Sequence, residues 1–316
     1  MAETRIKSSF IYLANAVRDL TGNWKVIGLV LAAPVFLSSM CLLPDAINLQ
    51  HLVSEAFNIG NQGQNVSFIP VQAPLATHIE PYVPQWVTRT ANTVFVVLTA
   101  VTILLVLCTL RWIREEHVEA SPLNSALQIY RRSLRRLLPF AWLYLLQLIA
   151  VLPMVLWVNA TLSLIYAVPV VVLIVPGFLA FVWLAVAQYA LVFDGYRTWL
   201  ALFYGRELLR GRFIRVAIRI IVFLAVWSGY SSWSLAAFFA LSLLLGLLGA
   251  FAGALWAGVF VADLLSMTVV FATTAFFFAA GLRLYEDLKA SAPATAAAMV
   301  AGPLSTTGPL QTAAAS

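Results

Sequence analysis

The sequence predicts an all-α integral membrane protein with six transmembrane helices and three amphipathic interfacial helices. Its 316 residues are 62% hydrophobic and only 10% charged, whereas a water-soluble domain needs about 25% charged residues. The mean hydropathy is +0.92, and the apolar residues are gathered into runs long enough to cross a bilayer. Lipid must therefore surround most of the side chains. A count of seven spans is the alternative that this pattern leaves open.

Residues 124–158 show the unit from which the chain is built. At 100° per residue, the first half of this segment has a basic face and an apolar face. The basic face consists of Gln128, Arg131, Arg132, Arg135 and Arg136. The apolar face consists of Ala126, Ile129, Tyr130, Leu134, Leu137 and Leu138. We expect this helix to lie flat at the bilayer surface, to turn at Pro139, and to continue as a span of about 20 residues.

The first unit begins with an amphipathic helix over residues 6–20. Its apolar face consists of Ile6, Phe10, Leu13, Val17 and Leu20. The sequence Thr21-Gly22-Asn23 ends this helix, and the first span follows over residues 24–43 with a kink at Pro34. A polar outer connection is expected over 44–89, with a short surface helix at 46–57. The second span covers residues 90–110.

The later units repeat this order of elements. The third span covers 140–158, and the fourth covers 162–193, which is long enough that kinks are expected at Pro169 and Pro176. The third interfacial helix covers 196–212. We then expect a fifth span at about 213–240, an intervening apolar helix, and a sixth span at about 259–282. The tail over 290–316 is rich in Ala, Ser, Thr, Pro and Gly, and we expect it to be disordered.

These elements predict one polytopic membrane domain over residues 1–289. It contains an internal repeat of an interfacial helix and two spans, in units of about 1–110, 120–193 and 196–289. A short cue aligns the three interfacial helices: Arg18-Asp19-Leu20, Arg132-Ser133-Leu134 and Arg206-Glu207-Leu208. The repeated order of the elements is stronger evidence for the repeat than these letters are.

The distribution of cations predicts the orientation. In the six-span layout, Arg89 alone among the 19 basic residues falls on the outer side. Basic residues concentrate in cytoplasmic segments of membrane proteins. We therefore expect a protein of the cell (inner) membrane with both termini in the cytoplasm.

The candidate contact residues are arginines of the second and third interfacial helices. They are suited to bind anionic lipid headgroups or the acidic surface of a partner. These residues are Arg131, Arg132, Arg135, Arg136, Arg206, Arg210 and Arg212. The alternative is that these arginines only fix the orientation of the protein.

Three polar residues fall inside apolar segments. Asp263 is a candidate for a proton or ion role, because an ionisable group in lipid is costly; the alternative is an interfacial carboxylate. Gln147 and Gln188 are expected to join spans by hydrogen bonds rather than to bind a substrate.

The sequence predicts no catalytic group, no cofactor and no metal site. His51, His78 and His117 lie far apart, without a cysteine or carboxylate at ligand spacing. Cys41 and Cys108 both lie within apolar segments. Because the basic residues flank apolar spans, we also expect no nucleic-acid partner.

Two motifs resemble a bacterial family. The first is Val192-Phe193-Asp194-Gly195 followed by residues 204–213 (YGRELLRGRF), and the second is residues 284–289 (LYEDLK). They are similar to patterns in the membrane domain that accompanies some glycerophosphodiester phosphodiesterases and in related stand-alone proteins. The resemblance covers about residues 120–290. It implies a six-span helical domain with interfacial helices and implies no phosphodiesterase activity, since the catalytic domain has no counterpart here.

The function expected from the sequence is non-enzymatic. A scaffold or accessory subunit of a membrane assembly is the first hypothesis. A transporter or lipid-handling protein, which binds anionic headgroups through its arginines, is the alternative. The expected partners are membrane lipids and, for the scaffold, other integral membrane proteins.

Overall fold

A computed structural model describes residues 8–61, 83–115, 121–160, 164–251 and 255–292, and these residues are helical almost throughout. The predicted interfacial piece at 46–57 lies within a longer helix, whereas Ile6, most of the outer connection and nearly all of the tail lie outside the described residues. The elements in chain order are α1 (Ser9–Gly22), α2 (Trp24–Asn61), α3 (Gln85–Arg114), α4 (Pro122–Ala160), α5 (Leu164–Tyr189), the π-helical turn η1 (Ala190–Asp194), α6 (Thr198–Leu209), α7 (Phe213–Phe251) and α8 (Leu255–Ala290).

Within these described ranges, six helices are long and apolar enough to cross a membrane, and no strand is present. The predicted fold class, an all-α multi-pass membrane protein with six spans, is thereby confirmed. The qualifying segments are Trp24–Asp45, Gln85–Arg114, Pro122–Pro153, Leu173–Asp194, Phe213–Tyr230 and Ala257–Ala290. The seven-span alternative required a further span in the last apolar region. There α7 instead continues through residues 228–232 without a break and ends at Phe251.

The predicted turn at Pro139 is wrong, because α4 is one helix that contains both Pro139 and Pro153. The second interfacial segment and the third span are therefore continuous. Likewise, α2 contains Pro34 and Pro44 and runs on to Asn61, past the predicted end of the first span. A proline removes one hydrogen bond of the helix, but apolar surroundings make any further loss of backbone hydrogen bonds costly. The helix consequently continues on both sides of the proline.

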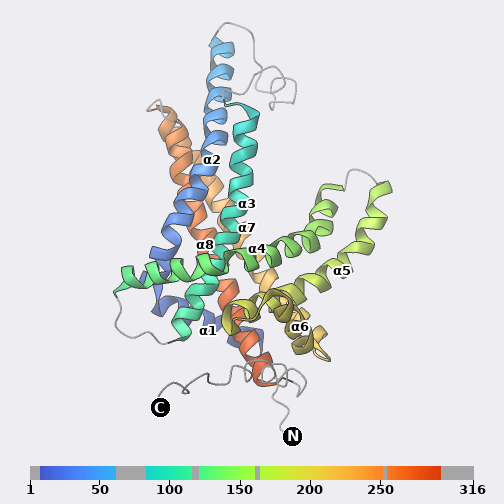
Figure 1. Ribbon diagram of the computed structural model, residues 1–316. Coiled ribbons are helices and arrows are strands. Elements are labelled where there is room, and N and C mark those ends of the chain that lie inside the picture. The colour runs from blue at the N-terminus through green and yellow to red at the C-terminus, as the bar shows by residue number, and fades with distance from the viewer. Residues whose placement is uncertain (1–7, 62–82, 116–120, 161–163, 252–254, 293–316) are drawn as a thin grey trace, which may run out of the picture.

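The helices α2, α3, α7 and α8 run along a common direction, and the hairpin of α4 and α5 runs across it (Figure 1). In the contacts of this bundle, α8 packs against α7, α2, α1 and α3, and α4 packs chiefly against α5. The short helices α1 and α6 lie at one end of the molecule, where α3 and α8 also end (Figure 1). We call this the basic end. Arg89 lies in the second turn of α3, at the opposite end.

The helix α1 is held against the protein by a face that the sequence pattern did not single out. Tyr12 is 1% exposed and Ala16 is fully buried, whereas Phe10 is 76% exposed. The ring of Tyr12 meets the ring of Phe223 in α7 edge-on. Its hydroxyl donates a hydrogen bond of 2.6 Å to Asp287 in α8. One side of α1 therefore contacts the bundle, and the predicted apolar side carries the exposed Phe10 and Val17.

Two small residues let helices approach closely around α5. A Cβ atom at Gly177 would lie 2.4 Å from the carbonyl oxygen of Ala150 in α4. A Cβ atom at Gly205 in α6 would lie 3.3 Å from the backbone nitrogen of Ala187. Small residues at such crossings allow helix backbones to pack together in membranes. The α4–α5 hairpin and the position of α6 depend on these contacts.

The substitution Gly177→Ala should therefore destabilise the hairpin. The added methyl group meets a backbone oxygen that cannot move independently of α4, so we expect a loss of about 1–3 kcal/mol, typical of overpacking. Thermal unfolding of the purified protein in detergent measures this effect. The matched control is Gly229→Ala, because a Cβ atom at Gly229 meets nothing within 4 Å. Equal stability of the two variants would contradict the close α4–α5 crossing.

Candidate functional site

The first turns of α4 have three faces where the sequence predicted two. Ala126, Ile129 and Ser133 are buried against the rest of the protein. A separate stripe of leucines is exposed, and the exposed fraction reaches 84% at Leu138. This stripe consists of Leu123, Leu127, Leu134 and Leu138. Arg131 and Arg135 are exposed. One side of this segment thus packs on protein, while its leucines and these two arginines face outward.

Arg136 lies inward, at the end of α5. Its guanidinium donates hydrogen bonds to the carbonyl oxygens of Leu191, at 2.8 Å, and of Val192. Arg111 of α3 donates to the same Val192 oxygen at 2.6 Å. The last carbonyls of a helix have no partner within the helix and carry partial negative charge. Two arginines from neighbouring helices therefore cap η1, and Gly195, with φ +75°, ends the helix in the left-handed conformation that suits glycine.

Arg132 forms an ion pair with Glu115 at 2.7 Å, and Arg111 binds the other oxygen of the same carboxylate at 2.6 Å. Partial burial raises the pKa of the Glu115 carboxyl, but the hydrogen bonds from Arg111 and Arg132 outweigh it, so that the pKa lies below its ordinary value. The end of α3 is thus joined to α4 by a pair that stays ionised at neutral pH.

The arginines of the third interfacial segment are distributed over its surface. Arg206 is exposed, and Arg210 is 74% exposed and lies 3.5 Å from Glu207. Arg212 donates a hydrogen bond of 2.5 Å to Ser291, which ties the start of α7 to the end of α8. The seven predicted arginines therefore do not form one patch. Some project outward, and others hold helix ends together.

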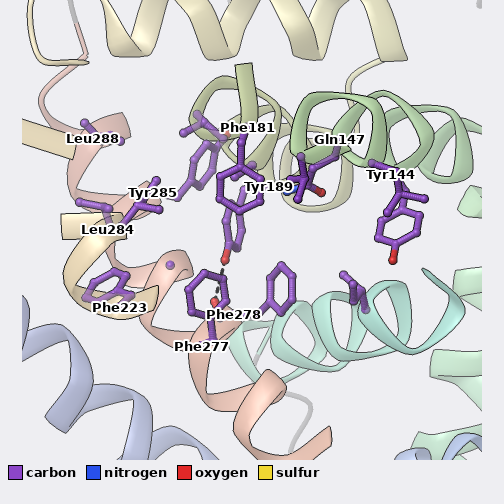
Figure 2. Close-up of a pocket in the computed structure, with 17 residues that line it drawn as sticks. Tyr144, Gln147, Phe181, Tyr189, Phe223, Phe277, Phe278, Leu284, Tyr285 and Leu288 are labelled. Carbon is purple, nitrogen blue, oxygen red and sulfur yellow. Dashed lines mark hydrogen bonds between the residues drawn. The ribbon is translucent and has the colours of Figure 1, made fainter. Parts of the chain in front are cut away.

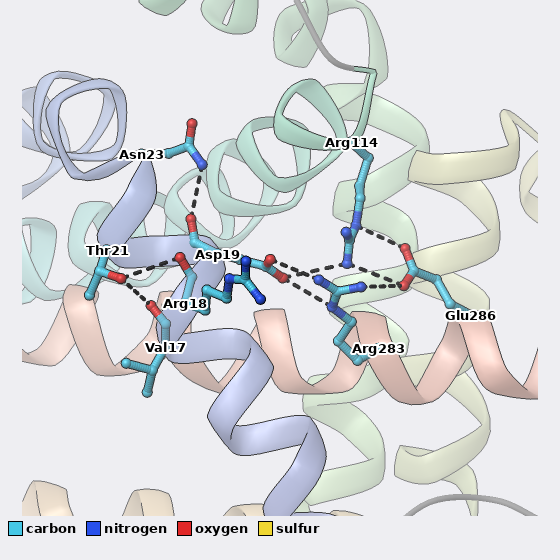
Figure 3. Close-up of polar contacts among 8 residues, drawn as sticks. All are labelled: Val17, Arg18, Asp19, Thr21, Asn23, Arg114, Arg283 and Glu286. Carbon is cyan, nitrogen blue, oxygen red and sulfur yellow. Dashed lines mark hydrogen bonds and ion pairs between the residues drawn. The ribbon is translucent and has the colours of Figure 1, made fainter.

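A four-membered charge network, which the sequence did not reveal, joins α1, α3 and α8 (Figure 3). Arg283 binds both oxygens of Asp19, at 2.8 and 3.0 Å. Arg114 binds Glu286 at 2.9 Å and approaches Asp19 at 3.4 Å. Arg283 also lies 3.5 Å from Glu286. The two carboxylates and two guanidinium groups neutralise one another, which lowers the cost of placing charge among packed helices.

A second polar cluster connects η1 to α8. Asp194 accepts a hydrogen bond from the hydroxyl of Tyr285 and lies 2.5 Å from the ammonium group of Lys289. Tyr285 stacks on Tyr189 with ring centroids 5.7 Å apart. Asp194 and the residues around Tyr285 belong to the two motifs of the proposed family resemblance. The structure brings these motifs together at the basic end.

Gln188 donates a hydrogen bond of 2.6 Å to Gln147 and so links α5 to α4. This is the role that the sequence predicted for these residues. Gln188 is fully buried, and its own carbonyl oxygen accepts no hydrogen bond from the described residues. A buried amide that is partly paired favours the close association of the two helices, because separation would leave both amides in an apolar environment.

Asp263 lies far from this site. It is half-buried eight residues after the start of α8, at the end of the bundle opposite the basic end. Asp45 of α2 is close enough to act on its charge. A carboxylate next to another carboxylate at the far end of two spans has no contact with the arginines, so Asp263 belongs to no common site with them.

A partly enclosed cavity of about 240 Å³ lies between the α4–α5 hairpin and the helices α7 and α8 (Figure 2). Its wall is mostly aromatic and aliphatic. Phe181, Tyr189, Phe223, Phe277, Phe278 and Tyr285 form much of it. The hydroxyl of Tyr189 donates to the carbonyl oxygen of Phe278 at 2.9 Å, and the hydroxyl of Tyr285 donates to Asp194. The side chain of Gln147 borders the same space. The cavity is thus an apolar chamber next to the charged clusters of the basic end.

The close packing of α5 on α8 shapes this cavity. A Cβ atom at Gly281 would lie 2.2 Å from the hydroxyl oxygen of Tyr189, so a larger residue there would displace the tyrosine side chain. This cavity was not predicted from the sequence. The available signals were the run Phe276-Phe277-Phe278 and the tyrosines at the ends of two spans.

The chain matches no family model, no curated protein and no solved structure. Among the described residues, no three His, Cys, Asp or Glu side chains converge as a metal site would require. His78 and His117 lie outside those residues, and Cys108 is buried while Cys41 is half-buried.

The charge network predicts that Arg283→Ala destabilises the protein. Asp19 would keep only the 3.4 Å contact with Arg114, and a poorly paired carboxylate among helices costs about 1–3 kcal/mol. Thermal unfolding in detergent measures the loss, with Arg18→Ala, an exposed arginine of the same end, as the control. A double-mutant cycle of Asp19→Asn with Arg283→Gln should give a combined loss smaller than the sum of the single losses. Additive losses would contradict a direct interaction.

The lowered pKa of Glu115 predicts an acid dependence of stability. A carboxyl whose pKa is lower in the folded than in the unfolded state stabilises the fold above its ordinary pKa, and this stabilisation is lost as pH falls through the lowered value. The melting temperature of the wild type should therefore decrease below about pH 5 more steeply than that of Glu115→Gln. Parallel pH profiles of the two proteins would show that the pairs with Arg111 and Arg132 contribute nothing.

Proposed function

We propose that this protein is a lipid-handling membrane protein that binds the hydrocarbon portion of a membrane amphiphile in the cavity between the α4–α5 hairpin and α7–α8. The single observation that carries the proposal is this apolar space of about 240 Å³, which adjoins a region rich in arginine. The proposal takes up the lipid-handling hypothesis of the sequence analysis. The binding of lipid in place of water follows from the chemistry of the cavity wall.

An apolar cavity of this size does not hold water stably, since water needs two to four polar partners at each site. The hydroxyls of Tyr189 and Tyr285 already donate their protons within the protein. Small apolar molecules occupy even smaller dry cavities, because contact with the wall replaces an empty surface. A membrane supplies acyl and isoprenoid chains in excess, so a segment of such a chain is the expected occupant of the cavity.

Cations in the helix turns that contribute to the cavity wall suit a negatively charged headgroup. Arg219 directly precedes Ile220, and Lys289 directly follows Leu288; both of these apolar residues line the cavity. Lys289 is 48% exposed in its side chain although it pairs with Asp194. Each cation near an anionic lipid surface contributes about 1 kcal/mol to binding. The charge at this end therefore supports an acidic amphiphile over a neutral one.

The proposed orientation places the basic end at the cytoplasmic face of the cell membrane. The cations of the described residues gather there, with Arg89 at the other end, and the positive-inside bias supports the same side. The leaflet that supplies the amphiphile would then be the inner leaflet, which carries the larger negative surface potential.

The scaffold hypothesis stays a prediction, and no contact in the described residues favours it over lipid binding. That the protein is not an enzyme also stays a prediction. The resemblance to phosphodiesterase-associated membrane domains is retained as a proposal about the packing of the helices.

The substitution Ala185→Phe tests the proposed site, because Ala185 lines the cavity and a benzyl group would occupy much of it. Native mass spectrometry of the protein purified in mild detergent should show a bound amphiphile on the wild type and a several-fold lower occupancy on the variant. Extraction and mass analysis of the released molecule would identify its class.

The control for this experiment is Leu179→Phe, which places the same ring on the exposed side of α5, where Leu179 is 43% exposed. It should retain the bound amphiphile. Equal occupancy of the two variants, at matched thermal stability, would refute the cavity as the binding site. A wild type that carries a stoichiometric protein partner and no amphiphile would favour the scaffold.

A further inference from the structure

A second hollow, distinct from the cavity, follows the line where α2 meets α8. It is an open groove of about 680 Å³ that begins at the end of α1. Its wall is formed on one side by Trp24, Gly28, Ala32 and Phe36, and on the other by Leu264, Thr268, Ala272 and Ala275. No residue that lines this groove also lines the cavity, so the two spaces can be tested independently.

Lys25 stands at the basic end of the groove. Gly28, Ala32 and Phe36 follow it at spacings of three, seven and eleven residues, which places all four on one face of α2. Gly28 and Ala32 leave the hollow because their side chains are small. The lysine is exposed, and its ammonium group lies 6.0 Å from the centre of the Trp24 ring, within the range of a cation–π contact.

The polar groups along the groove are already satisfied. The hydroxyl of Thr21 donates to the carbonyl oxygens of Val17 and Arg18, and that of Thr268 donates to Leu264. Asp19, next to the lining residue Leu20, is paired with Arg283 and Arg114. The floor of the groove is therefore apolar, and Lys25, which has no ion pair among the described residues, contributes a positive charge at its mouth.

The length of the groove matches one leaflet of a bilayer. Twelve residues separate Trp24 from Phe36, which corresponds to about 18 Å along a helix. The hydrocarbon core of a membrane is about 30 Å thick, so that one leaflet contributes about 15 Å. Trp24 is 66% exposed, as a tryptophan at the level of the headgroups would be.

We propose that this groove binds one acyl chain of an anionic phospholipid, whose phosphate is held by Lys25 beside Trp24. Three features favour this occupant: the positive charge at the mouth of the groove, its apolar floor, and its length, which matches one leaflet. A zwitterionic phospholipid would fill the groove equally well but would gain less from the lysine, because its headgroup carries no net charge. Lys25 is thus the residue that makes the groove prefer an anionic over a zwitterionic phospholipid.

The protein in detergent, titrated with phosphatidylglycerol or phosphatidylcholine and observed by native mass spectrometry, tests this proposal. The wild type should retain one phosphatidylglycerol molecule that Gly28→Leu loses, since the leucine side chain fills the hollow. Lys25→Ala should weaken the binding of phosphatidylglycerol about fivefold, as expected for one cation at an anionic headgroup. The binding of phosphatidylcholine should change little.

Matched variants separate this site from the cavity and from non-specific lipid. Gly229→Leu makes the same glycine-to-leucine change at an exposed position outside the groove, and Arg89→Ala removes one exposed cation at the opposite end of the bundle; both variants should keep the lipid. Ala185→Phe, which fills the cavity, should also keep it, so that failure of the proposed function leaves this result intact. If Gly28→Leu does not fold, the binding of phosphatidylglycerol to Lys25→Ala alone tests the proposal. Equal retention of both lipids, unaffected by Lys25→Ala, would overturn the proposal and mark the lipid as annular.

Discussion

The charge pairing of Asp19 and Glu286 with Arg114 and Arg283 is the constraint on which the basic end depends. These four side chains come from α1, α3 and α8 (Figure 3). A carboxylate among packed helices is costly unless an opposite charge compensates it. Because the compensation requires all three helices, the network fixes where α1 lies on the bundle. Both the cavity and the groove have lining residues in the helices that this network joins.

The helix α8 borders both the cavity and the groove, because different residues along it line each of them. Arg283 and Glu286 are three residues apart and face the network, whereas Leu284, Tyr285 and Leu288 face the cavity. Earlier in the same helix, Leu264, Thr268, Ala272 and Ala275 face the groove. One helix thus borders two apolar spaces, and its charged residues other than Asp263 lie in its last turns. Aromatic contacts, such as Tyr189 on Phe278 and Tyr285, hold the cavity side together.

Much of the fold could be predicted because hydropathy and helical period are local properties of the chain. The six spans, the presence of α1 and α6, and the segregation of cations all follow from short stretches of sequence. The continuity of α4 through Pro139 was not predictable in this way, since it depends on whether the surroundings penalise a broken helix. A role in joining spans was predicted for Gln147 and for Gln188, because a polar group in a span needs a partner nearby, but the sequence did not pair them with each other.

The arrangement of the candidate site could be predicted only in part. The sequence identified the arginines of α4 but could not distinguish Arg136, which caps η1, from Arg135, which is exposed. That distinction depends on where the end of α5 lies relative to α3 and α4. The cavity and the groove arise from which helix faces meet, and Asp19 and Arg283 are 264 positions apart in the chain. No local pattern contains this information.

Among the described residues, polar contacts anchor the hairpin of α4 and α5 at the end of α5. Arg136 and Arg111 hold it at the carbonyls of η1, and Ala187 holds α6 against it. Its other end extends away from α2, α3 and α8 (Figure 1). These anchoring contacts of the hairpin therefore lie where it meets the bundle. Since the cavity lies between this hairpin and the helices α7 and α8, the angle that these contacts set also determines the width of the cavity.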